Sequence, residues 1–302
     1  MVHSLRITGI IALAATAACS TDPIAPNHTV SVSAKGDVSA ASTNNVLVTE
    51  SDITRQLEDT PPTNNWVFYY RLLPTSTGAF VTGPGDPPLG VGSFQMSTLT
   101  VADKTTLFNY DHIGTRLADV TALSYQTYRD PSSDPGVALP SVNIEVDKSG
   151  PPYVLGDYLS LVFEPYLTYP NGIQSSTWQP WNAIAGKWWA TRDIVIDGTP
   201  CARQVCTFTW AQFVAAYPNA TILGGFGVNQ GSANIRLLAA TDALTIGHNG
   251  STWTYNFEPF RSPSTKDDCK KGGWQDLKEA NGSQFKNQGQ CIKYARENWG
   301  ET

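Results

Sequence analysis

Asp157-Tyr-Leu-Ser-Leu-Val-Phe-Glu164, followed by Pro165, is the stretch that decides the fold. A similar run returns further along the chain as Thr252-Trp-Thr-Tyr-Asn-Phe-Glu258, followed by Pro259. Because side chains of a strand alternate between its two faces, the apolar residues of each run share one face: Leu159, Leu161 and Phe163 in the first, Trp253, Tyr255 and Phe257 in the second. Each proline removes a hydrogen-bond donor and ends its strand. We therefore expect two core strands of a β-sandwich, each with a glutamate at its end on the face away from the core.

The rest of the chain fits a mainly β protein. It has 302 residues, with 15% charged side chains and many Gly, Pro and aromatic residues, a composition typical of extracellular β proteins rich in turns. Ten or more short strands, with one clear helix among them, predict an antiparallel β-sandwich of jelly-roll or concanavalin-like type. The net charge of -6 argues against a nucleic-acid partner, since such proteins carry a basic face.

The N-terminus predicts export. His3 and Arg6 precede an apolar run, residues 7–18, that is too short to span a bilayer as a helix. Ala17-Ala18-Cys19-Ser20 resembles the lipobox of bacterial lipoproteins, although Thr16 stands where that family usually has a large aliphatic residue. The resemblance implies that residues 1–18 are removed and that Cys19 is lipidated; a plain secretory signal cut near Ala18 is the alternative.

The chain divides into three further parts. Residues 19–45 lack aromatics almost entirely and are expected to form a disordered tether. Residues 46–260 form the expected sandwich, and residues 261–302 a small cysteine-containing C-terminal element.

Five cysteines occur, and setting Cys19 aside leaves an even four. Cysteines close in sequence meet most often in the unfolded chain. We therefore expect the disulfides Cys201–Cys206 and Cys269–Cys291, in keeping with export to an oxidising compartment.

The last thirty or so residues carry a distinctive motif. It begins Cys269-Lys-Lys-Gly-Gly-Trp274 and ends Phe285-Lys-Asn-Gln-Gly-Gln-Cys291. This resembles a short C-terminal element of many bacterial exported proteins, which carries no assigned activity. The resemblance implies an exported protein and leaves the function open.

Local patterns predict several elements. Ser141–Asp147 alternates cleanly, with Glu145 directed outward, and is expected to pair with Asp157–Glu164. His248-Asn249-Gly250-Ser251 predicts a hairpin turn that pairs Ala243–Gly247 with the second core strand. Thr209 is a good N-cap for a helix that Pro218 ends.

The sequence offers little machinery for catalysis. His3, His28, His112 and His248 are isolated along the chain, so no metal and no cofactor is expected. A serine-hydrolase triad lacks its nucleophile motif, and Gly224-Gly225-Phe226-Gly227 has no helix after it to bind phosphate. We lean towards a protein that is not an enzyme.

Two groups of residues remain as candidate sites. Trp178, Trp181, Trp188 and Trp189 lie in a polar stretch where flat aromatic faces could stack on sugar rings, although Trp188 and Trp189 should point to opposite faces. Glu164 and Glu258 have matched surroundings and are the only acid pair suited to a glycosidase; capping of strand ends is the simpler reading.

These observations favour an exported, lipid-anchored binding module of the bacterial cell envelope, with an extracellular glycan as the ligand. A glycoside hydrolase or lyase using Glu164 and Glu258 is one alternative. A structural or adhesive surface protein without a small ligand is the other.

Overall fold

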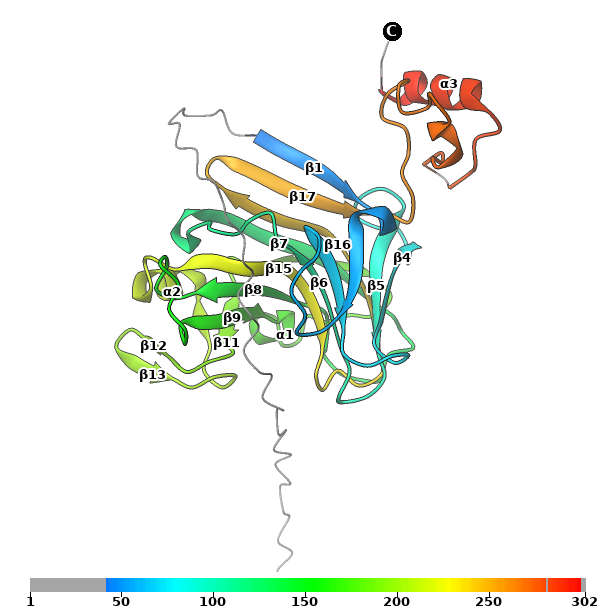
Figure 1. Ribbon diagram of the computed structural model, residues 1–302. Coiled ribbons are helices and arrows are strands. Elements are labelled where there is room, and N and C mark those ends of the chain that lie inside the picture. The colour runs from blue at the N-terminus through cyan, green and yellow to red at the C-terminus, as the bar shows by residue number, and fades with distance from the viewer. Residues whose placement is uncertain (1–41, 281, 300–302) are drawn as a thin grey trace, which may run out of the picture.

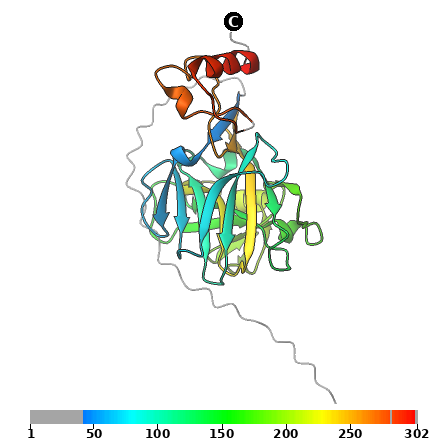
Figure 2. The same ribbon diagram turned by 90° about the vertical axis from the view of Figure 1, so that its right-hand side faces the viewer.

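The computed structural model describes residues 42–280 and 282–299, and each structural statement below refers to that part of the chain. Two large β-sheets stack on one another, and a small C-terminal element lies beyond one end of them (Figures 1 and 2). The predicted signal sequence, Cys19 and the tether as far as residue 41 lie outside the described residues.

Sheet A is built around one long strand. This strand is β16. It pairs with β7 along one edge. Along its other edge, its first half pairs with β5 and its second half with β17. The strands of sheet A are β1 (Ser42–Val48), β4 (Thr77–Thr82), β5 (Gly92–Thr98), β7 (Val120–Arg129), β10 (Trp178–Asn182), β16 (Leu237–His248) and β17 (Ser251–Phe257).

Sheet B has the order β14-β11-β9-β8-β15-β6-β3-β2. Its strands are β2 (Ile53–Leu57), β3 (Trp66–Tyr70), β6 (Lys104–Asn109), β8 (Ser141–Asp147), β9 (Tyr158–Phe163), β11 (Lys187–Ala190), β14 (Phe208–Thr209) and β15 (Thr221–Gly231). A separate hairpin joins β12 (Ile194–Ile196) to β13 (Thr199–Cys201).

Helices are few among the described residues. The α-helices are α1 (Pro165–Thr168), α2 (Trp210–Ala216) and α3 (Gln288–Trp299), and the 3-10 turns are η1 (Glu50–Asp52), η2 (Leu117–Asp119) and η3 (Gly273–Gln275). Thr209 caps α2 as expected: its hydroxyl accepts from the Gln212 backbone N–H, and Gln212 reaches back to Thr209.

The core lies between the two sheets and is rich in aromatic rings. Trp66 of sheet B meets the Tyr255 ring of sheet A edge to face, with centroids 4.9 Å apart. Phe68 meets Phe94 in the same way at 5.5 Å. Such pairs add to the free energy gained from burying the rings.

The predicted strand neighbours are confirmed. β8 and β9 pair antiparallel, with Ile144 opposite Leu161, and β16 and β17 form the hairpin whose turn is Asn249-Gly250. The expected core residues of the first run, Leu159, Leu161 and Phe163, are buried. The mainly β sandwich expected from the sequence is therefore the observed fold.

The sheets are not purely antiparallel, because the first two described strands, β1 and β2, each run parallel to a neighbour. β1 runs parallel to β17, and β2 parallel to β3. β1 begins at Ser42, so residues 42–45, which the sequence assigns to the tether, already belong to sheet A. Ser42, Thr43 and Asn45 are exposed on this edge strand, so the first part of β1 has a polar sequence without the apolar alternation that would reveal a strand.

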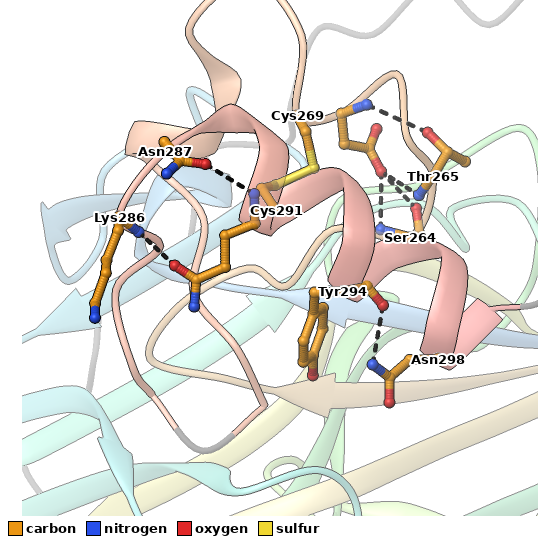
Figure 3. Close-up of a disulfide and its surroundings, with 10 residues drawn as sticks. Ser264, Thr265, Cys269, Lys286, Asn287, Cys291, Tyr294 and Asn298 are labelled. Carbon is orange, nitrogen blue, oxygen red and sulfur yellow. Dashed lines mark hydrogen bonds between the residues drawn. A yellow bond between two sulfur atoms is a disulfide. The ribbon is translucent and has the colours of Figure 1, made fainter.

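The C-terminal element has a core of its own around the predicted disulfide Cys269–Cys291 (Figure 3). Both cysteines are buried together with Leu277, Phe285 and Ala295. Local hydrogen bonds close its ends: Asp268 accepts from Ser264 and Thr265, and the Asn298 side chain donates to the Tyr294 carbonyl (Figure 3). The second predicted disulfide, Cys201–Cys206, also forms.

We expect the Cys269–Cys291 disulfide to stabilise the C-terminal element alone. Replacing both cysteines with serine should cost the element roughly 3 kcal/mol and expose its amides to hydrogen exchange, while the sandwich melts at an unchanged temperature. The Cys201→Ser/Cys206→Ser variant is the control and should leave exchange in the element as it was. A cooperative loss of the whole sandwich on removal of Cys269–Cys291 would contradict this independence.

Candidate ligand-binding groove

Sheet B turns one face to the core and the other outward. In β8, Ile144 and Val146 are buried in the core, whereas Asn143 and Glu145 point outward. This outer face holds the groove described below.

The floor of the groove is strand β15, where glycines replace side chains. A Cβ on Gly224 would lie 2.2 Å from Oε2 of Glu145, and a Cβ on Gly225 would lie 2.2 Å from the Phe108 ring. The register between β15 and β8 shifts between Ile222 and Phe226, so these glycines form an irregularity in the sheet. The space that side chains would need at these two positions is filled by the Glu145 carboxyl and the Phe108 ring, which lie directly against the β15 backbone. The groove is the hollow above them, and Leu223 and Gly224 of β15 contribute to its lining.

Glu145 is the central polar group of this hollow. Its Oε2 accepts from the Gly225 backbone N–H at 2.6 Å, and its Oε1 accepts from the Tyr158 hydroxyl at 3.0 Å. Burial raises the pKa of the carboxyl, while these two hydrogen bonds act in the opposite direction. The carboxyl is thus held in one position at the groove floor and titrates above its ordinary range.

An aromatic wall flanks the floor on the β3 and β6 side. Val67, Tyr69 and Phe108 form a small apolar cluster on the outer face, with Tyr110 packed against it. The hydroxyls of Tyr69 and Tyr110 lie 2.9 Å apart, and burial raises the pKa of Tyr69 to about 12. Both phenols therefore stay protonated and can donate hydrogen bonds at neutral pH.

Charged groups line the rim. Glu58 accepts from Lys104 and from Arg71. Burial alone would raise the pKa of Glu58, but the two cations outweigh it and hold that pKa below its usual value. Next to it, burial and the charge of Glu58 raise the pKa of Asp59.

The groove encloses about 170 Å³, less than the roughly 300–1,000 Å³ typical of pockets for drug-sized ligands. Its enclosed part therefore has room only for a small chemical group, about the size of one six-membered ring. Further lining residues come from β9, from the segment that follows β11 and from the loop after β2: Tyr158, Ser160, Thr191, Arg192, Thr60, Pro61 and Pro62.

This combination suits a ligand with both apolar and hydroxyl-bearing faces. The exposed parts of Tyr69 and Phe108, 7% and 8% of each residue, and of the half-buried Tyr110 offer a small apolar surface, and Glu145, Asn143 and the phenols offer hydrogen bonds. Within residues 42–280 and 282–299, no group of three or more His, Cys, Asp or Glu side chains is arranged to hold a metal ion.

The four predicted tryptophans lie outside this groove. Trp181 and Trp188 are buried in the core, at 4% and 0% exposure, so neither ring has a face for a ligand. Trp178 lies on sheet A, where its Nε1 donates to the Pro84 carbonyl. Trp189 points outward, opposite to its neighbour Trp188 as expected.

Trp189 shares the outer face of sheet B with the groove. It pairs with Val162, two residues along β9 from Ser160. A ligand longer than one sugar ring could therefore reach from the groove to this ring.

The two glutamates of the suggested acid pair follow strands of different sheets and have different partners. Glu164 follows β9 of sheet B, and Glu258 follows β17 of sheet A. Glu164 accepts from Trp189 Nε1 at 2.9 Å and from the Tyr166 hydroxyl at 3.0 Å. Glu258 accepts from the Val91 backbone N–H at 2.9 Å. Glu258 thus binds a backbone amide, as the simpler reading of the sequence expected, whereas Glu164 accepts from two side chains and makes no capping hydrogen bond.

Glu258 acts with a buried aspartate to hold the Gly- and Pro-rich loop between β4 and β5. Asp242 accepts from the backbone N–H groups of Leu89 and Phe257. Burial raises the pKa of Asp242 to about 7, with the nearby Glu258 adding to the effect. The backbone N–H groups of Leu89 and Val91 in this irregular loop thus donate to the carboxylates of Asp242 and Glu258.

Two histidines that are far apart in sequence meet in the fold. His112 Nδ1 lies 3.0 Å from His248 Nε2, and His112 Nε2 lies 2.7 Å from the Tyr255 hydroxyl. The Trp253 ring stacks on His248 with centroids 4.6 Å apart. Because 136 residues separate His112 from His248, the sequence contains no local pattern that predicts this contact.

Alternation along β8 predicts that Glu145 points outward but not that it has a role in a site. Gly224-Gly225-Phe226-Gly227 by itself is only a glycine-rich run without the following helix that phosphate binding needs. A glycine-rich strand facing an outward acid was the available signal. It becomes informative only once β15 is known to lie between β6 and β8.

Comparison of the chain with protein-family models, with curated proteins and with solved structures found no match.

We expect Gly225→Ala to destabilise the sandwich by roughly 1–3 kcal/mol, because its Cβ would overlap the Phe108 ring. Adding Phe108→Leu should restore part of the loss by making room, which a double-mutant cycle in urea would measure. Additive losses in the cycle would show that the two residues do not meet.

The histidine pair predicts a loss of stability in acid. Burial, with the neighbouring His248, lowers the pKa of His112 to about 4, whereas an unfolded histidine titrates near 6.5. The unfolded state thus binds more protons as the pH falls from about 6.5 to about 4, and up to about 3 kcal/mol of stability should be lost across that window.

His112→Gln keeps a polar side chain and removes the titration. Urea melts across the window should show a shallower acid loss for this variant than for the unaltered protein. Equal slopes would contradict the assignment.

Proposed function

We propose that this protein is an exported glycan-binding module of the bacterial cell envelope and that the groove on the outer face of sheet B is its binding site. The observation that carries the proposal is the glycine floor of β15 lying between the Tyr69–Phe108–Tyr110 wall and the fixed carboxyl of Glu145. Sugars present C–H faces to aromatic rings and hydroxyls to carboxylates.

The expected location supports a glycan ligand. Both disulfides are typical of proteins that fold in an oxidising compartment outside the cytoplasm. Among the described residues, no helix is long and apolar enough to cross a membrane. We infer that the chain reaches the envelope through its N-terminal signal and is held there by a lipid on Cys19, as the lipobox-like Ala17-Ala18-Cys19-Ser20 implies.

Glycoside hydrolysis is the second candidate, and it moves from Glu164 and Glu258 to the groove. Glu145 and Asp59 both line this hollow, and both carboxyls titrate above their usual range, as a general acid requires. Release of reducing ends from a bound glycan, abolished by Glu145→Gln, would favour this activity over simple binding.

Adjacent tryptophans provide a matched pair of variants. Trp189→Ala should weaken glycan binding by roughly 1–3 kcal/mol, by analogy with other aromatic stacking sites. Trp188→Ala should instead cost about 3–5 kcal/mol of stability, since that ring is wholly buried.

The groove itself is tested by Tyr158→Phe and Glu145→Gln, with Trp178→Ala on sheet A as the control. A glycan array first identifies the ligand, and titration then measures each variant. We expect both groove variants to lose affinity and the control to keep it. Binding that survives both groove changes, or fails only with Trp178→Ala, would place the site elsewhere.

A further inference from the structure

Exposed aliphatic side chains gather at one end of the sandwich. Twelve large hydrophobic residues are exposed in the described part of the chain, and five of them lie on three short loops. These five define what we call the apolar tip: Leu72, Leu73, Leu99, Val101 and Ile235. Scattered exposed hydrophobics are normal, but such a concentration marks an interaction surface.

The loops of the apolar tip are joined to one another, so they form one surface. The buried carboxylate of Asp103 accepts from Thr75 and Ser76 of the first loop and from the backbone N–H groups of Leu99 and Thr100 of the second. Its pKa is lowered, because these hydrogen bonds outweigh the effect of burial.

The third loop is tied to the second. Thr98 Oγ1 donates to the Asn234 carbonyl, and the Ala233 backbone N–H donates to the Val101 carbonyl. The apolar side chains are therefore presented by a fixed framework.

The three loops of the apolar tip have cations at their ends, although the protein as a whole has a net charge of -6. The charged residues of the three loops and their ends are Arg71, Lys104, Arg236 and Asp103, and Asp103 is buried. Glu58 neutralises part of this charge through Arg71 and Lys104, which leaves Arg236 as the cation next to Ile235.

The apolar tip and the C-terminal element occupy opposite ends of the sandwich. β5 runs from Gly92, beside Glu258, to Thr98, beside the tip (Figure 1). The groove rim at Glu58 and Lys104 adjoins the tip through Arg71, whose guanidinium also donates to Ser232 of the third loop.

We propose that the apolar tip is a membrane-contacting surface that dips into the interface of an anionic lipid bilayer. Shallow insertion needs apolar side chains at the surface and cations at headgroup level, and the three loops supply both. A second copy of the chain fits less well, because a stable interface buries roughly 800 Å² on each partner, more than five half-exposed aliphatic side chains on three loop ends offer.

Vesicle co-sedimentation tests this proposal with the secreted chain carrying Cys19→Ala, so that no acyl chain contributes. The probes are vesicles of phosphatidylcholine alone and of phosphatidylcholine mixed with phosphatidylglycerol. The unaltered tip should bind the mixed vesicles more tightly, and Arg236→Gln should reduce that preference.

The decisive variant is Leu73→Asp/Val101→Asp, which places two carboxylates on the apolar tip. It should lower vesicle affinity by at least about tenfold. The matched control is Leu155→Asp/Val205→Asp, at two positions that are each 80% exposed and lie outside the tip, and it should bind as the unaltered protein does. All four positions are exposed, so thermal melts should coincide.

Three outcomes would overturn the proposal: no binding to either kind of vesicle, equal losses in the tip variant and the control, or a dimer in sedimentation equilibrium that the tip variant dissociates. The last would assign the apolar tip to self-association. Glycan binding in the groove is measured separately, so its success or failure is independent of this result.

Discussion

The packing of two sheet faces against each other is the constraint on which the rest of the structure depends. Sheet B contributes the aliphatic side chains of β8 and β9, and sheet A contributes aromatic rings such as Tyr255 and Phe257. Because a strand's side chains alternate strictly, burying Ile144 and Leu161 obliges Glu145 and Ser160 to face outward. The polar groove is therefore a direct consequence of the register that the core requires.

The same constraint shapes the floor of the groove. β15 lies in the interior of sheet B, where its inward residues Phe226 and Val228 fill the core. Its outward positions at Gly224 and Gly225 carry no side chain, so Phe108 and Glu145 can close over the strand backbone. The Glu145 carboxyl is hydrogen-bonded to the Gly225 N–H and to the Tyr158 hydroxyl. Its position is therefore fixed in the absence of a ligand, which reduces the ordering that any binding would require.

Much of the fold could be predicted from the sequence because its signals are local. Alternation identified β8 and β9, an Asn-Gly turn identified the β16–β17 hairpin, Thr209 identified the start of α2, and spacing identified both disulfides. The candidate site could not be predicted in the same way, because its members come from strands that are distant in sequence. Glu145 meets Gly225, and His112 meets His248, only through the strand order. The burial of Trp181 and Trp188 could not be predicted for a related reason. The alternation along a strand does not reveal which of its two faces the other sheet covers.

The central claim is that a glycan occupies the glycine-floored groove, and selective ¹⁵N-glycine labelling tests it most directly. The chain has 25 glycines. Gly224 lines the groove, Gly225 is hydrogen-bonded to Glu145 of the groove, and most others serve as internal controls. On titration with a glycan identified by array, the amide signal of Gly225, whose N–H binds Glu145, should shift together with that of Gly224. Shifts confined to glycines elsewhere, such as Gly92 beside Glu258 or Gly273 in the C-terminal element, would contradict the account.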